Sequence, residues 1–278
     1  MKLGIRAHDL PIFNDVDQLA AELHKLNFSY VQFAPRVSLD KLTDSGKNVS
    51  FGLADSVRKT FARNKISIAV LGCYVNIIHP DLKLRAKNCQ QFEKYLSLAS
   101  SFGSALVATE TGSVDPNFNF TKENWDGKIV EQTINEVRSL TDTAAKLGCL
   151  VGIEPGINHP IHSVGLTKRL LQEVSSPNLK IILDPANLVY QASDQATELV
   201  AEAIENFGES IYAFHLKDYA FKAGKKVVTP IGIGDAAISE MVKIIADFQC
   251  EPYVILDETP QKDFKQSLIN ANQIIDKL

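Results

Sequence analysis

Hydrophobic residues in this sequence recur in short runs of four to seven positions, separated by longer stretches in which apolar residues follow a helical period. Each run is too short for a core helix, and several are rich in β-branched residues, which is typical of buried strands. We therefore predict eight strands, at residues 3–7, 30–33, 66–72, 105–109, 150–153, 180–183, 211–216 and 253–256.

The stretches between these strands place apolar residues three or four positions apart, which indicates amphipathic helices. In the first stretch this spacing joins Val16, Leu19, Leu23 and Leu26. Further stretches of the same kind give about eight helices in all, and the clearest lie at residues 92–99, 129–140, 199–207, 241–244 and 264–278. Three helices are followed by a glycine, where we expect a left-handed residue that ends the helix, at Gly103, Gly148 and Gly208.

Strict alternation of strands with helices predicts a parallel sheet that is covered by helices. Eight such units fit a (β/α)8 TIM barrel in which residues 1–278 form a single α/β domain. An open doubly wound sheet is the alternative. It is disfavoured because the first strand leads into His8-Asp9-Leu10-Pro11 and not into the G-x-G-x-x-G turn of dinucleotide-binding sheets. Further along, Gly232-Ile233-Gly234-Asp235 predicts a tight turn before a helix that aspartate caps.

Charge and composition exclude several classes of protein. The 29 basic and 33 acidic residues give a net charge of −4 without a basic block, so nucleic acid is not an expected partner. The uncharged stretch 66–80 is shorter than the roughly 18–20 apolar residues that span a membrane. The N-terminus lacks the apolar segment of a secretory signal, and the four cysteines lie far apart. We expect reduced thiols, no zinc–thiolate cluster and a cytoplasmic location.

Polar side chains gather where the predicted strands end, which is the active-site face of such a barrel. One carboxylate after a strand is more often only a helix cap, but carboxylates and a histidine after strands five to eight would converge. They repel one another, and burying them unpaired is costly. The sequence therefore predicts a divalent metal ion, Mn²⁺, Mg²⁺, Co²⁺ or Zn²⁺, held by three carboxylates and one imidazole. The polar residues at the strand ends are His8, Asp9, Asn76, His79, Glu110, Glu154, Asp184, Asn187, His215, Lys217, Asp218, Asp257 and Glu258.

Five short motifs follow one another in the second half of the chain. They are Ile153-Glu154-Pro155, Leu183-Asp184-Pro185-Ala186-Asn187-Leu188, Phe214-His215-Leu216-Lys217-Asp218, Pro230-Ile231-Gly232-Ile233-Gly234-Asp235 and Leu256-Asp257-Glu258. In this order they resemble the xylose isomerase-like TIM barrel superfamily, in its branch of sugar-phosphate isomerases and epimerases. That branch contains ketose 3-epimerases, inosose dehydratase and, more distantly, endonuclease IV. The strand pattern extends the resemblance over nearly the whole chain.

The resemblance implies one metal ligand from each of the last four strands, namely Glu154, Asp184, His215 and Glu258. It also implies that Glu154 and Glu258 act as the acid and base. Because side chains alternate along a strand, only one of the adjacent Asp257 and Glu258 points into the barrel. Many members of the superfamily have a histidine at the position of Asn187, and this difference argues against a multi-zinc nuclease centre.

The implied function is that of a metal-dependent isomerase or epimerase acting on a sugar or sugar phosphate. One glutamate removes the proton from the carbon beside a carbonyl, a cis-enediolate forms, and the other glutamate returns a proton. An inosose-type dehydratase would use the same site and begin with the same step. A sugar-binding barrel without chemistry and an endonuclease IV-like nuclease are less favoured alternatives. Members of the superfamily are often dimers or tetramers, so a homo-oligomer is compatible with the resemblance.

Several side chains near the predicted site have both a binding role and a structural alternative. The hydroxyls or phosphate of a carbohydrate substrate would be held by His8, His79, Glu110, His162, Asn187 and Lys217. The alternatives are a turn for His79 and an exposed loop for His159 and His162. The loop 220–229, with its three lysines, would close over an anionic ligand or remain solvated. A connection after the fourth strand would form a lid or pack against a helix through Phe118, Phe120 and Trp125.

Overall fold

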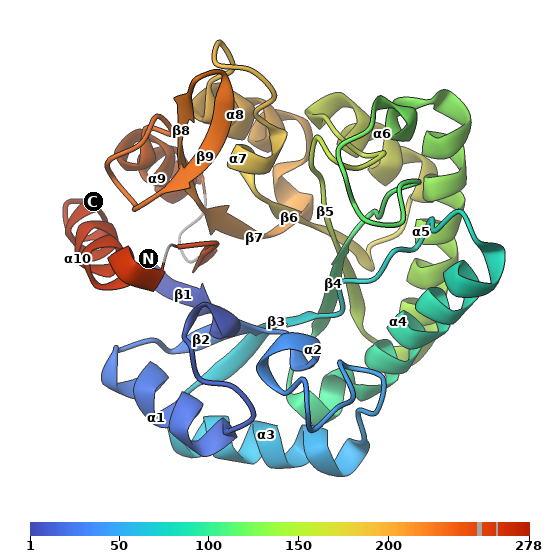
Figure 1. Cartoon of the computed structure of the whole chain (residues 1–278), viewed down its shortest axis with the longest axis horizontal. Helices are drawn as coiled ribbons and strands as arrows, with labels where there is room; N and C mark the ends of the chain where they lie inside the picture. The colour runs from blue at the N-terminus through green and yellow to red at the C-terminus, as the bar shows by residue number, and fades with distance from the viewer. Residues whose placement is uncertain (249–251, 260) are drawn as a thin grey trace.

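The computed structural model describes residues 1–248, 252–259 and 261–278. Within these ranges, eight parallel strands close into a barrel that helices surround (Figure 1). This arrangement confirms the predicted (β/α)8 TIM barrel. The barrel strands are β1 (Lys2–Arg6), β2 (Tyr30–Phe33), β3 (Ser67–Gly72), β4 (Leu106–Glu110), β5 (Leu150–Glu154), β6 (Leu179–Leu183), β7 (Ile211–Leu216) and β10 (Tyr253–Leu256).

Eight longer helices form the outer layer of the described part of the chain, and two four-residue helices, α2 (Pro35–Ser38) and α7 (Pro185–Leu188), follow β2 and β6. Two of the three expected helix-ending glycines are confirmed, because Gly103 and Gly148 have left-handed backbones with φ of 74° and 69°. The longer helices are α1 (Val16–Lys25), α3 (Phe51–Arg63), α4 (Leu82–Phe102), α5 (Gly127–Leu147), α6 (Val164–Val174), α8 (Ala196–Phe207), α9 (Ile238–Phe248) and α10 (Phe264–Ile275).

Side chains along the barrel strands alternate between the barrel interior and the helix layer. One apolar cluster inside the barrel includes Ala108 of β4, Ile182 of β6, Ala213 of β7 and Ile255 of β10. The residue two positions further along each strand points in the same direction. These residues are Glu110, Asp184, His215 and Asp257. The alternation therefore changes the interior from apolar to polar at the carboxyl ends of the strands.

The prediction for Gly208 is wrong. Its backbone is right-handed, with φ −49° and ψ −44°, and the chain continues into the short 3-10 helix η3 (Gly208–Ser210). Glycine is needed at position 208 for a reason other than a left-handed backbone. A Cβ atom at Gly208 would lie 2.6 Å from the Phe248 ring, so the close approach of α9 requires glycine.

The segment 220–229 is not a loop, because it lies within an antiparallel hairpin of β8 (Asp218–Lys222) and β9 (Lys225–Thr229). Alternation over so few residues was too weak to predict it. The tight turn at Gly232 is present, with φ 84°. Asp235, however, is not the expected cap of the next helix, because α9 begins only at Ile238. The Asp235 Oδ2 atom instead accepts a hydrogen bond from the Phe221 backbone N–H at 2.9 Å.

Three of the four cysteines lie within the described residues. Cys73, Cys89 and Cys149 are free thiols, and Cys250 lies outside the described residues. Within the described ranges, no helix is both long enough and apolar enough to cross a membrane.

Candidate active site

Three of the predicted ligands meet at one point inside the barrel mouth. Glu154 ends β5, Asp184 follows β6, and His215 lies on β7. Each offers one ligand atom, and these atoms all lie within 4.8 Å of one another. His215 Nδ1 is 3.5 Å from Glu154 Oε1 and 3.9 Å from Asp184 Oδ2. All three side chains are buried, so neighbouring strands with the same inward direction bring this triad together.

The orientation of His215 is set by Gln32 on β2, which faces it across the barrel. The Gln32 Oε1 atom lies 2.9 Å from His215 Nε2, so Nε2 carries the proton and Nδ1 faces the two carboxylates. Gln32 in turn donates to the Tyr74 hydroxyl at 2.7 Å, and Tyr74 donates to Glu154 Oε2 at 3.2 Å. Sequence reasoning missed Gln32, although it is the one polar residue in the apolar strand Tyr30–Phe33.

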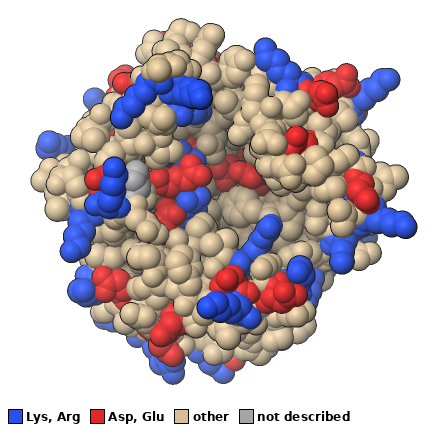
Figure 2. Space-filling view, viewed as in Figure 1, with Lys and Arg blue, Asp and Glu red and all other residues tan. Residues whose placement is uncertain are grey.

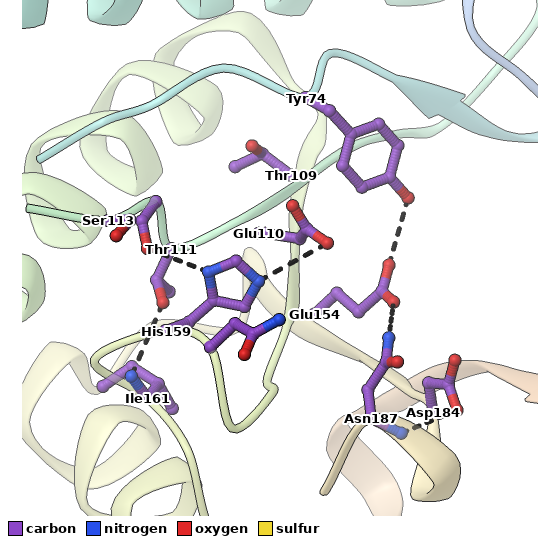
Figure 3. A network of polar contacts seen from close by, with 12 residues as sticks. Tyr74, Thr109, Glu110, Thr111, Ser113, Glu154, His159, Ile161, Asp184 and Asn187 are labelled. Atoms are coloured by element: carbon purple, nitrogen blue, oxygen red, sulfur yellow. Dashed lines mark hydrogen bonds and ion pairs between the residues drawn. The ribbon is translucent and has the colours of Figure 1, made fainter. Parts of the chain in front are cut away.

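Asp184 has two roles, one on each carboxylate oxygen. Its Oδ1 accepts a hydrogen bond from the Asn187 N–H and caps the short helix α7. Its Oδ2 accepts no well-aligned hydrogen bond, although Lys217 Nζ lies 2.9 Å away. Asn187 donates to Glu154 Oε1 at 2.9 Å, so the amide at this position ties the turn after β6 to the triad (Figure 3).

A second charged cluster faces the triad from β1 and β10. Lys217 Nζ contacts Asp257 Oδ2 at 2.6 Å and Glu258 Oε2 at 3.0 Å. Arg6 contacts Asp257 Oδ1 at 2.9 Å and Asp9 Oδ1 at 2.7 Å. Burial opposes ionisation of Asp257, but Lys217 and Arg6 hold the pKa of its carboxyl well below the usual value. Burial alone would lower the pKa of Lys217, whereas Asp184 and Asp257 raise it well above the usual value.

The structure decides which of the adjacent acids after β10 points inward. Asp257 is buried, whereas the Glu258 side chain is 47 % exposed. The register explains the difference, because Ile255 pairs with His215 and Asp257 continues the same interior row. Glu258 has a left-handed backbone, with φ 49°, and does not join the triad atoms. Its assignment as the fourth ligand stays a prediction.

The triad fits a divalent cation. His215 Nδ1 is buried without a hydrogen-bond partner among the described residues, and it faces two carboxylates. In the site as a whole, six carboxylates (Asp9, Glu110, Glu154, Asp184, Asp257 and Glu258) lie around two permanent cations (Arg6 and Lys217), so the acids outnumber these cations by four. Carboxylate and imidazole donors of this kind suit Mn²⁺, Mg²⁺, Co²⁺ or Zn²⁺. Glu154, Asp184 and His215 are the residues that would hold the cation.

A cavity of about 210 Å³ opens beside the triad. Figure 2 shows the hollow at the barrel mouth with acidic and basic side chains on its floor. Among the predicted substrate-binding residues, His8, Glu110, Asn187 and Lys217 line it. Arg6, Gln32 and Tyr74 also line it and were not predicted; a charged or polar residue inside or just after a buried strand was the available signal. The full lining is Arg6, His8, Gln32, Ala34, Val37, Tyr74, Glu110, Glu154, Asn187, Lys217, Asp257 and Glu258.

The structure does not bring His79 and His162 to this cavity. His79 Nδ1 accepts a hydrogen bond from the Asp81 N–H, as expected for a residue in a turn. His162 stacks on Trp125, with ring centroids 4.6 Å apart, and its Nδ1 contacts the Pro160 carbonyl. Trp125 also packs edge-on against Phe120 and donates its indole N–H to the Ile157 carbonyl. These contacts favour the packing role of the aromatic residues over a lid.

His159 connects the cavity wall to the loop after β4. Its Nε2 lies 3.4 Å from Glu110 Oε1, and its Nδ1 lies 2.8 Å from the Gly112 carbonyl (Figure 3). Burial alone would lower the pKa of His159, but the contact with Glu110 raises it above the usual value. His159 is buried, so the alternative of an exposed loop is wrong for this residue.

Two motifs that resemble the superfamily have a structural role on the hairpin side of the mouth. Buried Asp218 accepts hydrogen bonds from the backbone N–H groups of Gly232, Gly234 and Ala236. A Cβ atom at Gly234 would lie 2.3 Å from Asp218 Oδ1, so glycine is required there. Lys226 donates to the Ala186 and Val189 carbonyls, and burial lowers its pKa to about 8. Asp218 and Lys226 thus fix the hairpin and the turn that carries Asp184.

Comparison with known proteins identifies the family to which the chain belongs. The sequence profile of the family described as "Xylose isomerase-like TIM barrel" matches residues 20–274. The chain belongs to this family. No curated protein sequence matches the chain.

Solved structures of the xylose isomerase-like TIM barrel family superpose on the whole chain at low sequence identity. The probable 3-DHS dehydratase AsbF from Bacillus anthracis has a TM-score of 0.78 at 14% identity, with 100% of each chain covered. The IOLI protein with a binding zinc atom has a TM-score of 0.76 at 16% identity, and the match covers 100% of this chain and 97% of the IOLI chain. D-Psicose 3-epimerase from Clostridium cellulolyticum H10 has a TM-score of 0.74 at 16% identity, and the match covers 100% of this chain and 98% of the epimerase chain. Identities this low establish the shared fold alone.

Proposed function

We propose that this protein is an enzyme that uses a divalent metal ion to isomerise or epimerise a small carbohydrate. The observation that carries the proposal is the buried triad of Glu154, Asp184 and His215, whose ligand atoms face one another within 4.8 Å beside an open cavity. A carboxylate–imidazole triad needs a cation to offset its charge repulsion. The likeness to an epimerase, to a zinc-binding protein and to a dehydratase supports chemistry at this position.

The bound cation would act as a Lewis acid on a substrate carbonyl and its neighbouring hydroxyl. The residues of the chain do the rest. Tyr74 and Asn187 hold the two oxygens of Glu154 by hydrogen bonds, which aims its carboxylate at the cavity. Glu154 then removes the proton from the carbon beside the carbonyl. Lys217 stays paired with Asp184, Asp257 and Glu258 at the edge of the cavity and holds these acids in place.

The cavity favours an unphosphorylated sugar among the predicted substrates. Its volume of about 210 Å³ lies below the range of roughly 300–1,000 Å³ that is typical of drug-sized ligands, and suits a single small ring or open chain. Its lining contains four carboxylates, and its two cations, Arg6 and Lys217, are already paired with acids. A phosphate would meet repulsion here, whereas hydroxyl groups can donate hydrogen bonds to these carboxylates.

A dehydratase is the second candidate. It begins with the same proton abstraction, and Glu110 next to Glu154 provides a second carboxyl group within the same cavity. Product mass separates the two candidates, because an isomer keeps the mass of the substrate and a dehydration product loses one water.

The test combines metal analysis of the purified protein with a screen of ketoses, ketose phosphates and inososes. We expect bound divalent metal, turnover of an unphosphorylated compound, and at least about 10²-fold loss of turnover in Glu154→Gln. The matched control is Glu202→Gln on the exposed side of α8, which should behave as wild type. Turnover that survives in Glu154→Gln would contradict the proposed role of this residue.

A further inference from the structure

The acid after β10 is poorly placed to exchange a proton with a substrate. Asp257 is buried, and each of its oxygens contacts a cation, Arg6 at 2.9 Å and Lys217 at 2.6 Å. Glu258 contacts the same lysine at 3.0 Å from the exposed rim. The carboxylates of both acids are thus turned toward Arg6 and Lys217. The reaction proposed above needs a second proton-transfer group besides Glu154, and the cavity offers another one.

Glu110 ends β4 directly beside Glu154. The two residues are partners in the parallel register of β4 and β5, so their side chains leave neighbouring strands on the same side of the sheet. Both line the 210 Å³ cavity, and the Glu110 side chain keeps 34 % exposure to it and to solvent. Figure 3 shows both carboxyl groups extending toward the same open space. No described lysine or arginine forms an ion pair with Glu110.

Buried His159 stands behind Glu110. Its Nε2 faces Glu110 Oε1 at 3.4 Å, and its Nδ1 is fixed by the Gly112 carbonyl at 2.8 Å. Because the Gly112 carbonyl can only accept, Nδ1 carries the imidazole N–H and Nε2 is left facing Glu110, so Glu110 Oε1 and His159 Nε2 form a dyad that shares one transferable proton. This arrangement of a positioned carboxyl group and an orienting imidazole is the usual construction of a general acid.

We propose that Glu110, positioned by His159, is the second catalytic acid–base residue, and that it works on the same face of the substrate as Glu154. The proposal rests on the proposed function and narrows it. Two carboxyl groups on neighbouring strands reach the substrate from one side. They suit a proton shift between adjacent carbons or the removal of a β-hydroxyl as water. Epimerisation returns the proton to the opposite face, which this pair does not serve.

The two carboxyl groups exchange protons with the substrate in opposite directions. Glu154 takes the proton from the carbon beside the carbonyl as the C–H bond of that carbon breaks, and the electron pair of the bond moves into the enediolate. In isomerisation, the dyad gives its proton to the former carbonyl carbon, and a hydroxyl proton passes between the two vicinal oxygens. In dehydration, the dyad gives the proton to the departing hydroxyl as the C–O bond breaks. Glu154 then returns its proton to water, and the half-exposed Glu110 regains one from water.

The experiment follows two signals from one sample by proton NMR in D₂O. The whole protein, supplied with Mn²⁺ that is removed before the spectra are recorded, is incubated with D-fructose, D-tagatose, D-psicose and an inosose. One signal is the loss of the substrate hydrogen beside the carbonyl, which reports proton removal by Glu154. The other is the appearance of product. We expect Glu110→Gln to retain hydrogen exchange within about threefold of wild type and to lose product formation by at least about 10²-fold.

Two further variants separate catalysis from structure. Glu110→Asp keeps a carboxyl group and should recover part of the product formation. His159→Gln should shift the ratio of exchange to product in the same direction as Glu110→Gln, by about tenfold, because it removes only the positioning partner. Glu202→Gln on α8 is the control for the amide substitution. Thermal unfolding confirms that each variant is folded.

The outcomes distinguish the two proposals. Product formation at the wild-type rate in Glu110→Gln, or an equal loss of exchange and product, would overturn the role of Glu110 while leaving the proposed function intact. An epimer as the product would overturn the same-face arrangement. A wild-type protein that exchanges no hydrogen with any compound of the panel would overturn the proposed function and the role of Glu110 together.

Discussion

The two sides of the cavity contain the same kinds of acidic side chain in opposite electrostatic settings. On the side of β5 to β7, Glu154 and Asp184 face an imidazole nitrogen that has no hydrogen bond within the described part of the chain. On the side of β1 and β10, Asp257 is enclosed by Arg6 and Lys217. The histidines follow the same contrast. Burial lowers the pKa of His8, next to Arg6, to about 4, whereas Glu154 outweighs burial and raises the pKa of His215 to about 9.

The contrast shows how a barrel can bury many charges at one mouth. The side of β1 and β10 supplies its own cations, Arg6 and Lys217, and we call it the fixed wall. The side of β5 to β7 leaves the ligand atoms of its triad facing one another, where they are available for a metal ion. Lys217 lies between the two sides, since it contacts Asp184 as well as Asp257. Substitutions on the two sides should therefore change different properties, stability on one and cation affinity on the other.

The largest expected effect is on stability, from Lys217→Met. This substitution leaves buried Asp184 and Asp257 without their shared cation, and breaking a buried ion pair from one side costs about 3–5 kcal/mol. Urea unfolding in the presence of EDTA measures the loss. Addition of Mn²⁺ should restore more stability to the variant than to wild type, because a bound cation replaces part of the missing charge.

The control for this substitution is Lys168→Met on α6. Lys168 is on the surface, where its ammonium group donates to the Asn206 side chain at 2.9 Å, so the loss of stability should stay within about 0.5 kcal/mol. If Lys217→Met is as stable as wild type in EDTA, the carboxylates around it do not depend on its charge, and the fixed wall is not built as described.

Asp184→Asn should lower the affinity for Mn²⁺ or Zn²⁺ by more than about 10²-fold, since even outer partners of metal ligands contribute 10- to 100-fold. Its effect on folding should be small, because the amide oxygen can still accept from the Asn187 N–H at the start of α7. Isothermal titration calorimetry measures the affinity.

Glu258→Gln provides the contrast from the other side. Its side chain is half-exposed and contacts Lys217 at the rim, so we expect a change in cation affinity below about threefold. A loss as large as that of Asp184→Asn would identify Glu258 as a ligand and would remove the division between the two sides.

The last prediction concerns the pH dependence of stability. The pKa of His8 is about 4 in the folded chain and 6.5 in the unfolded chain, so between these values the unfolded chain binds more protons. Stability is therefore lost as the pH falls from 6.5 toward 4. Because His8 is only partly buried, we expect about 1–2 kcal/mol of this loss to disappear in His8→Asn. Urea unfolding at several pH values measures it, with the exposed His24→Asn as control. Identical pH profiles for His8→Asn and wild type would show that His8 does not titrate in this environment.

Much of the architecture could be predicted from local pattern. Strands 30–33, 211–216 and 253–256 have the predicted ends, because a short apolar run with polar residues beside it is visible in a single strand. Residues missed at the site depend on partners far away in the sequence. Gln32 contacts His215, 183 positions away in the sequence, only because β2 faces β7 across the barrel. Gly208 likewise required the approach of Phe248 from another helix.

The sequence by itself determined the number of barrel strands, their direction and the acids that follow them, since these depend on composition and spacing along the chain. The tertiary structure alone decided the contacts that give each acid its chemistry. It placed Asp257 rather than Glu258 inside, and enclosed it between Arg6 and Lys217. It also set Glu110 beside Glu154 with His159 behind it. The physical reason is that ionisation and metal affinity depend on charges within a few ångströms, and closure of the barrel fixes those distances between residues that are remote in sequence.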